Sequence, residues 1–210
     1  LESHHVQSVA QLYHLCEAKL AAIWGSSVMA SIWWRQLRGH DLPYRPTQRR
    51  TVGHTHVLPP QLRTPEAARA VMVRMIHKAA TRMRRLGYSA GRLDTMVKYT
   101  DAPRWRQWSH VVPPSRDTLS LLHVLGDLWP TSPRHQPLHV GVVLSDLVAD
   151  QSATVPLFQK QRHLSDLADA MDKIDARHGR HTIYFAGMYG AQDSAPTRIS
   201  FTQIPGVDEF

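Results

Sequence analysis

Hydrophobic and polar positions from residue 51 to 145 follow two periods, which predict strands and helices in a definite order. Four segments have the two-residue period of strands: residues 51–58, 92–99, 105–112 and 138–145. A long helix begins after the capping residue Thr64, with Pro65 at its first position, and ends near Gly87. A shorter, leucine-rich helix separates the last two strands. This order predicts an α+β fold: a two-layer βαββαβ domain with a mixed four-stranded sheet, one face of which is left open.

The long helix has an apolar stripe that we expect to be buried and a basic stripe on another side. The apolar stripe comprises Ala68, Val71, Met72, Met75, Ile76, Ala79, Met83 and Leu86. The basic stripe comprises Arg74, Lys78, Arg82 and Arg85. Since the helices cover one sheet face, these cations should point away from the open face. They form either a solvated surface or a contact with distal DNA or a neighbouring domain.

The open face is predicted from strand alternation. In the second strand Leu93 and Val97 should face the helices, which leaves Lys98 on the open side. The other residues expected on this face are Thr51, Gly53, Thr55, Arg92, Asp94, Met96, Arg106, Trp108 and His110. Small, polar and basic groups suit contact with a sugar-phosphate backbone regardless of its sequence. A merely solvated sheet face is the alternative.

The chain before this domain is predicted to be helical from residue 8 to 38, with a break at residues 24–27. Two short helices joined through Gly25 form a possible helix-hairpin-helix, in which the amides of Ser26 and Ser27 could hold a phosphate. An ordinary helical hairpin fits the same spacing. We therefore divide the chain into a helical segment (1–42), a basic linker (43–50), the sheet domain (51–149) and a region with a loop, a helix, a strand-like segment at 181–185 and a tail (150–210).

The amino-acid composition indicates that the binding partner is anionic. There are 25 Lys and Arg against 17 Asp and Glu, a net charge of +8, and the isoelectric point is near 10.1. Such a balance favours nucleic acid first and an acidic membrane surface second. The single cysteine, Cys16, allows no intrachain disulfide, fits a cytoplasmic protein and is expected to be buried. No apolar run approaches the roughly 20 residues of a membrane span. The abrupt start without a signal peptide suggests a fragment.

The sequence has no pattern typical of a catalytic or metal site. His54 and His56 would lie on one strand face, but this pair is more typical of hydrogen-bonded packing than of a zinc site. Four aspartates recur at steps of three along the later helix, at Asp166, Asp169, Asp172 and Asp175. We expect them to form a hydrated acidic face, and we predict no catalytic residue, metal or cofactor in this chain.

Several segments, in order, resemble the C-terminal half of Y-family (DinB/UmuC-like) translesion DNA polymerases. The matching segments are LAAIWG (20–25), WRQLRGHD (34–41), RRTVGHTH (49–56), LDTMVKYTD (93–101) and VGVVLSDL (140–147). The first two resemble the end of the thumb domain, and the others resemble strands of the little-finger domain. Two further segments resemble the tail of some bacterial members: DAMDKID (169–175) and RISFTQI (198–204). The catalytic palm, where Mg²⁺ would bind, has no counterpart in this chain.

The resemblance implies roles for particular residues. The little finger grips both backbones of template-primer DNA, which carries over to Arg50, Thr51, Gly53, Thr55, Lys98, Arg106 and His110. The thumb hairpin holds the duplex through amides at Gly25, Ser26 and Ser27, although Val28 and Met29 stand where many members have a second glycine. A sliding-clamp peptide is expected at TVPLF (154–158), anchored by Leu157 and Phe158, unless that pair docks on the protein's own surface.

Two other functions remain open at this stage. An RNA-binding module also uses a four-stranded sheet with two helices, and Trp108 could serve as a stacking residue on it. A non-catalytic polymerase relative could act as a scaffold that recruits the sliding clamp through Leu157 and Phe158 without gripping DNA. The parent protein resembles a DNA-directed DNA polymerase, whereas this segment is expected to carry no catalytic residue.

Overall fold

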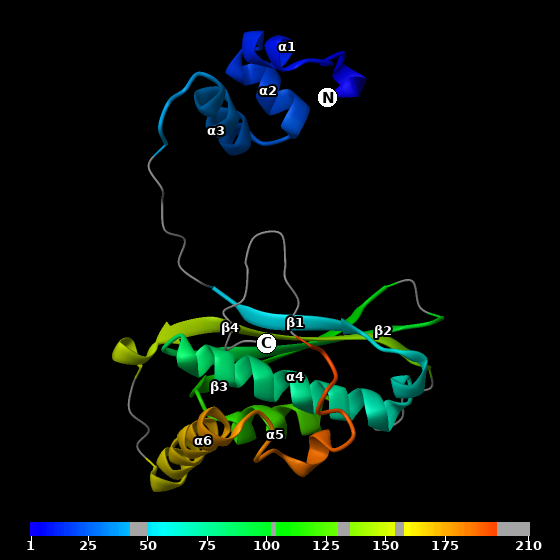
Figure 1. Ribbon diagram of the computed structural model, residues 1–210, viewed down its shortest axis with the longest axis vertical. Helices are drawn as coiled ribbons and strands as arrows, with labels where there is room; N and C mark the ends of the chain where they lie inside the picture. The colour runs from blue at the N-terminus through cyan, green and yellow to red at the C-terminus, as the bar shows by residue number, and fades with distance from the viewer. Residues whose placement is uncertain (43–49, 102–103, 130–134, 154–157, 197–210) are drawn as a thin grey trace. The chain divides into compact units, whose positions relative to one another are not determined.

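The computed structural model divides the chain into two compact units, Leu1–Gln48 and Arg49–Phe210, which are considered separately (Figure 1). The structure describes residues 1–42, 50–101, 104–129, 135–153 and 158–196. Most of the predicted linker, residues 43–49, therefore lies outside the described residues. None of the described helices is long and apolar enough to cross a membrane.

The first unit contains three α-helices after a short 3₁₀ turn: α1 (Val9–His14), α2 (Glu17–Trp24) and α3 (Ser27–Leu37). Gly25 ends α2 in the left-handed conformation, with φ of 63°, and Ser26 caps α3 by accepting a hydrogen bond from the amide of Met29. The hairpin predicted around Gly25 is present. The prediction of a buried thiol is wrong, because a second break separates α1 from α2 and leaves Cys16 exposed.

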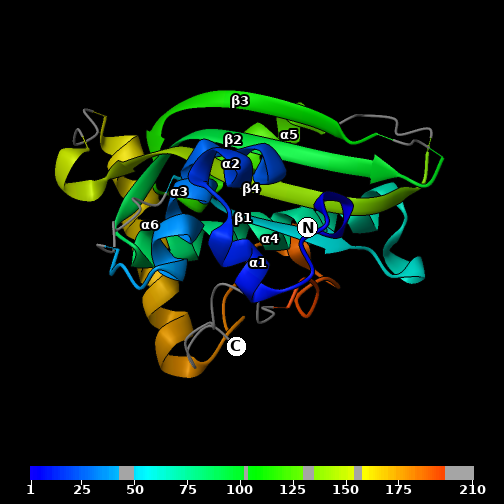
Figure 2. The ribbon, with the colours of Figure 1, turned by 90° about the horizontal axis from the view of Figure 1, so that it is seen from above.

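The second unit is a sheet covered on one face by helices. Its elements follow the predicted order: β1 (Val52–Val57), α4 (Pro65–Arg85), β2 (Tyr88–Tyr99), β3 (Arg106–Ser115), α5 (Thr118–Leu128) and β4 (Pro137–Ala149). The strands lie in the order β1-β4-β2-β3, as Figure 2 shows, and all three pairings are antiparallel. The expectation of a mixed sheet is wrong. The α4 crossover does make β1 and β2 run the same way, but β4 lies between them.

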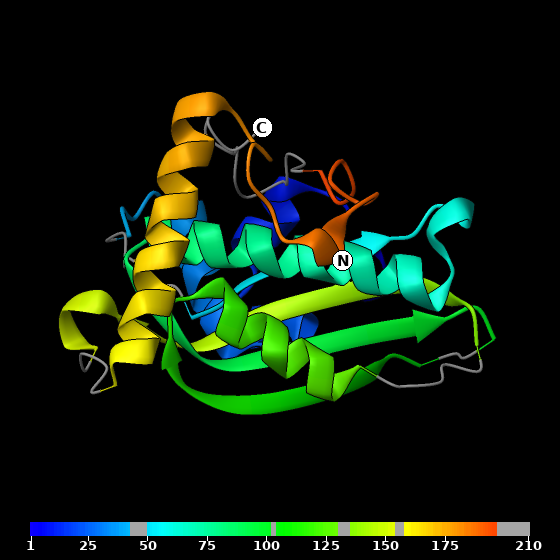
Figure 3. The same cartoon turned by 90° about the horizontal axis from the view of Figure 1, so that it is seen from below.

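The core lies between the sheet and the helices α4 and α5, which lie along the same sheet face (Figure 3). From β2 it takes Leu93 and Val97, and from β4 Val140 and Val142. The α4 stripe is buried as predicted, except Leu86, which caps the helix end and is 40% exposed. Thr64 caps α4, and Gly87 follows it with φ of 73°, a conformation that glycine adopts without strain.

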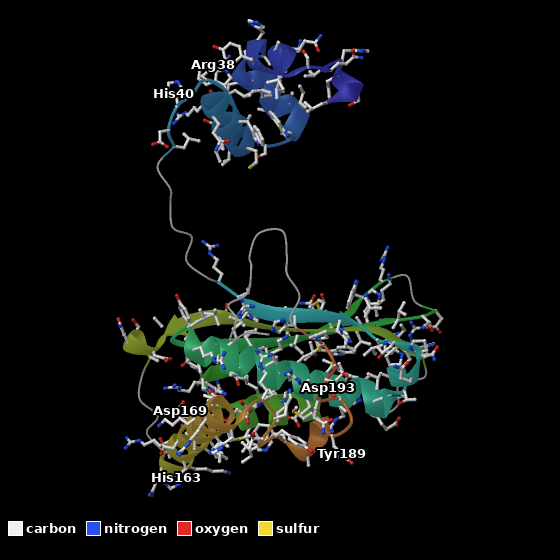
Figure 4. The ribbon with its side chains drawn as sticks, in the orientation of Figure 1. Arg38, His40, His163, Asp169, Tyr189 and Asp193 are labelled. Atoms are coloured by element: carbon white, nitrogen blue, oxygen red, sulfur yellow. The ribbon has the colours of Figure 1, made fainter. Side chains whose placement is uncertain are left out.

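The region after β4 packs on the helix layer and not on the open sheet face. Helix α6 (Gln159–His178) packs against α5, and the 3₁₀ helix η4 (Ala186–Met188) packs on α4. Residues 181–185, predicted to be strand-like, belong to no strand. Figure 4 shows Asp169 on α6 and the later residues Tyr189 and Asp193 on the side of the unit away from the sheet. The helix layer is thus thickened while the opposite sheet face stays free of these segments.

The basic stripe of α4 holds this region in place. Arg74 is buried and donates from Nε to the carbonyl oxygen of Gln192 at 2.8 Å, and Lys78 donates to the carbonyl oxygen of Ala195 at 3.0 Å. Both cations therefore anchor the polypeptide after η4. The predicted solvated surface is wrong for these two residues.

The acidic residues of α6 are also engaged in contacts. Asp172 forms an ion pair with the buried Arg84, with 2.7 Å between Nε and Oδ2. Asp169 contacts Arg116 at 3.1 Å, and Asp175 accepts a hydrogen bond from the amide of Ile183. The prediction of a hydrated acidic face is wrong at these three positions. The carboxylates attach α6 to α4, to the segment before α5 and to the tail.

Candidate nucleic-acid interface

The open face is defined by the strand register, because residues directly opposite each other in an antiparallel pair point to the same side. Gly53 pairs with Val143, which pairs with Asp94, which pairs with Ser109. The complete face comprises Gly53, Thr55, Val57, Arg92, Asp94, Met96, Lys98, Gln107, Ser109, Val111, His139, Gly141, Val143 and Ser145. We call this set the open face. It is small and polar over most of its area, as strand alternation in β1 and β2 predicted.

The third strand contributes different residues from those predicted. Arg106, Trp108 and His110 pair with Val97, Thr95 and Leu93, all of which are buried under the helices. Their side chains therefore leave the sheet on the helix side. Trp108 packs against the core, and the Arg106 guanidinium lies 5.9 Å from the centre of the buried Tyr99 ring. Their expected position on the open face is wrong.

Cationic groups lie at the two ends of the open face. Lys98 shares one end with His139, its direct partner on β4. At the other end of the face, Arg92 of β2 pairs with Ser145 of β4. Arg50, just before β1, is exposed and lies beyond this pair. Lys98 and Arg92 are six positions apart on β2, which corresponds to roughly 20 Å of strand. This span exceeds the roughly 12 Å width of a DNA major groove, so Lys98 and Arg50, which lies beyond Arg92, can reach the phosphates of both strands.

The centre of the open face is acidic and hydroxyl-rich. Asp94 accepts hydrogen bonds from the hydroxyls of Ser109 and Ser145, the latter at 3.2 Å. Arg92 is paired with Asp146 at 2.9 Å, so much of its charge is compensated locally. A phosphate is repelled by Asp94, whereas a groove lined by base edges can lie over it. The charge pattern thus favours a duplex whose backbones lie toward the two ends.

Gly53 allows β1 and β4 to approach each other closely. A Cβ atom at this position would lie 2.7 Å from the carbonyl oxygen of Val142 and 2.9 Å from a methyl of Val143. Thr51 and Thr55, on either side of it in the alternation, are exposed. Glycine is therefore required at this position by the packing of β1 against β4. The sequence had suggested another reason, namely that a small residue lets a phosphate approach the backbone.

The two histidines of β1 lie on the helix side and not on the open face. His54 and His56 pair with Val142 and Val140, which are buried in the core. Burial, together with the charges of Lys78, Arg82 and Arg74, lowers the pKa of His54 to about 4. In the described part of the chain no three His, Cys, Asp or Glu side chains are grouped to hold a metal ion. His54 is therefore a neutral packing residue at neutral pH.

The turn from α2 to α3 has the local geometry that a phosphate contact requires. Gly25 and Ser27 are exposed, and the first amides of α3 have no partner within the helix. Beside the turn, Trp24 and Trp33 stack with ring centres 5.9 Å apart. Arg38 braces this unit by donating to the carbonyl oxygens of Trp34 and Tyr13 at 3.1 and 2.7 Å. Phosphate binding by Gly25, Ser26 and Ser27 stays a prediction.

The expected clamp-binding pair is only partly within the described residues. Leu157 lies outside them. Phe158 is the residue before α6, and its side chain is 70% exposed. Docking of Phe158 on the protein's own surface is therefore not observed.

Comparison with known families agrees with the arrangement of the second unit. The model of the impB/mucB/samB family C-terminal domain matches residues 49–157, more than half of the chain. The chain belongs to this family, which is the C-terminal domain of Y-family polymerases of the DinB/UmuC type. No curated protein sequence matches the chain. The resemblance of the segments between residues 49 and 157 to the little-finger domain is thereby confirmed, and the thumb and tail resemblances stay predictions.

Proposed function

We propose that the open face binds duplex template-primer DNA through its phosphates, without reading the sequence, and holds a translesion polymerase on damaged template. The observation that supports this function best is the charge pattern: Lys98 at one end of the open face, the exposed Arg50 next to the other end, and an acidic, hydroxyl-rich centre between them. Family membership supports DNA as the partner. The interface consists of Arg50, Thr51, Gly53, Thr55 and Lys98; Arg106 and His110 leave it because they lie on the other side of the sheet.

The RNA-binding alternative loses its main support. That mode of binding stacks bases on aromatic residues in the central strands of the sheet. The central strands β4 and β2 present Val143, Asp94 and Met96 to the open face, with His139 at one end, and Trp108, the residue expected to stack, lies on the opposite side. Phosphate contact with duplex DNA uses the groups that the face does present.

Recruitment of the bacterial sliding clamp is a second function that one observation favours. Phe158 exposes 70% of its surface at the start of α6, where the family motif places an apolar anchor. A large exposed aromatic side chain suits insertion into a partner's pocket. We expect Phe158→Ala to abolish clamp pull-down and leave DNA affinity unchanged; retained pull-down would exclude this anchor.

A matched pair of variants tests the DNA-binding face. Lys98→Ala removes a cation from the open face, and Arg106→Ala removes one from the helix side at the same end of the sheet. Each phosphate contact contributes about 0.9 to the slope of the logarithm of the binding constant against the logarithm of the salt concentration. At about 0.1 M salt this corresponds to a roughly eightfold change in affinity. We expect Lys98→Ala to weaken binding about five- to tenfold for every duplex sequence, and Arg106→Ala to change it less than twofold.

Fluorescence anisotropy with several labelled duplexes, between about 50 and 200 mM salt, measures both quantities. The Lys98→Ala variant should also have a salt slope smaller by about one. Equal losses for the two variants, or a loss at Lys98 confined to some sequences, would contradict the proposed interface.

A further inference from the structure

One corner of the open face is aromatic and exposed. Val57, His139 and Lys98 form a single rung across β1, β4 and β2. Trp105, directly before β3, reaches the same corner and meets His139 edge to face, with ring centres 5.4 Å apart at 81°. We call these four residues the aromatic corner.

The corner leaves ring surface free for a ligand. Two rings at a right angle cover at most one of their four faces, and Trp105 is 41% exposed. Val57 beside them is 55% exposed. Exposed Trp and Val side chains that lie together, beside a second aromatic ring, suit contact with a flat apolar ligand. The elements that follow β4, α6 and η4, pack on α5 and α4, on the other side of the sheet.

We infer that the aromatic corner binds an unpaired nucleobase of single-stranded DNA next to the duplex that the open face holds. A base presents a flat π surface that stacks on an aromatic ring whatever its identity. Lys98 pairs directly with His139 across the strands, which puts a cation within reach of the phosphate of the same nucleotide. An aromatic surface and a cation together match one nucleotide. This inference rests on the proposed DNA-binding function and adds a second, single-stranded substrate class to it.

The test compares two DNA substrates on the full 210-residue chain. One is a blunt duplex, and the other is the same duplex with a single-stranded 5′ template extension. We expect Trp105→Ala to weaken binding of the extended substrate about tenfold and to change binding of the blunt duplex less than twofold. Trp105→Phe keeps an aromatic ring and should retain most of the affinity. The control is Val111→Ala, another exposed apolar residue of the open face but at its opposite end; it should not affect the extension.

Each other outcome decides a separate point. If Trp105→Ala weakens binding of both substrates equally, or of neither, the inference is wrong. Neither result contradicts the proposed binding of duplex DNA by the open face. An effect of Val111→Ala as large as that of Trp105→Ala also overturns it, because the effect is then not specific to the corner. If the unaltered chain binds no duplex at low salt, the proposed function fails. Binding of a single-stranded oligonucleotide that depends on Trp105 would then still support the corner. Circular dichroism verifies that each variant is folded.

Discussion

The ion pair between Arg84 and Asp172 should be a principal attachment of α6, and Asp172→Asn should break it. The Arg84 side chain is 3% exposed and binds both carboxylate oxygens, from Nε at 2.7 Å and from Nη2 at 2.8 Å. Burial alone would raise the pKa of Asp172, but the hydrogen bonds and charge of Arg84 hold it below its ordinary value. The asparagine variant keeps the volume of the side chain and leaves the buried guanidinium without its counter-charge.

The magnitude follows from this burial. Removing one partner of a buried pair costs about 3–5 kcal/mol of the free energy of unfolding. We expect about 3 kcal/mol, the lower end, because Asp172 remains 22% exposed and Arg84 keeps the carbonyl of Arg116 as an acceptor. For a unit of this size that loss corresponds to a melting temperature lower by roughly 10 °C.

The matched control is Asp169→Asn, one turn earlier on the same helix. Asp169 also binds an arginine, but it and Arg116 are 38% and 34% exposed, so the pair should contribute less than about 1 kcal/mol. Urea unfolding, followed by circular dichroism at neutral pH, measures both variants. Similar losses for Asp172→Asn and Asp169→Asn would refute the argument from burial. Neither variant should change DNA affinity while it is folded, since α6 lies on the side away from the open face.

Three further predictions concern two histidines, His54 of β1 and His77 of α4, and two residues of the open face. His54 and His77 have pKa values lowered to about 4, chiefly by burial, from an unfolded value near 6.5. The unfolded state therefore binds the extra protons, and the free energy of unfolding should fall by roughly 3 kcal/mol per ring between pH 6.5 and 4; urea midpoints that do not change over this range would contradict it. Gly53→Ala places a Cβ 2.7 Å from the Val142 carbonyl oxygen and should lower the melting temperature, whereas an unchanged value would exclude this close contact. Asp94→Asn removes the charge that repels phosphate from the centre of the open face and should raise duplex affinity severalfold by anisotropy, the opposite of the change expected if Asp94 bound the DNA.

The faces of β1 and β2 were predictable from the sequence, and those of β3 were not. In β2 the apolar residues Leu93 and Val97 lie an even number of positions apart, so they point to the same face, and alternation identified both faces of the strand correctly. In β3 apolar residues occur on both faces of the strand. Trp108 and Val112 lie on the helix side, and Val111 lies on the open side. The pattern of β3 alone therefore does not identify its inner face, whereas the positions predicted on β1, which is also an edge strand, are correct. The burial of Val112, two positions from His110, identifies the inner face only once the structure is known.

The tail was unpredictable for a different reason. Its attachment uses backbone carbonyls of Gln192 and Ala195, which every sequence has, so no side-chain pattern could indicate them. The basic stripe of α4 was visible in the sequence, but its partners were not. Sequence reasoning also missed the aromatic corner, because Trp105 and His139 are far apart in the chain and meet only through the strand register.

Methionine methyl resonances give the most direct test of which face binds DNA. Met96 lies on the open face, whereas Met72 and Met75 are buried in the core and Met188 is buried under the tail region on the helix side. On titration with duplex DNA, we predict that the Met96 methyl signal shifts and that the Met72, Met75 and Met188 signals stay in place. A shift at Met188 with an unchanged Met96 signal would contradict the assignment of the open face as the DNA-binding surface.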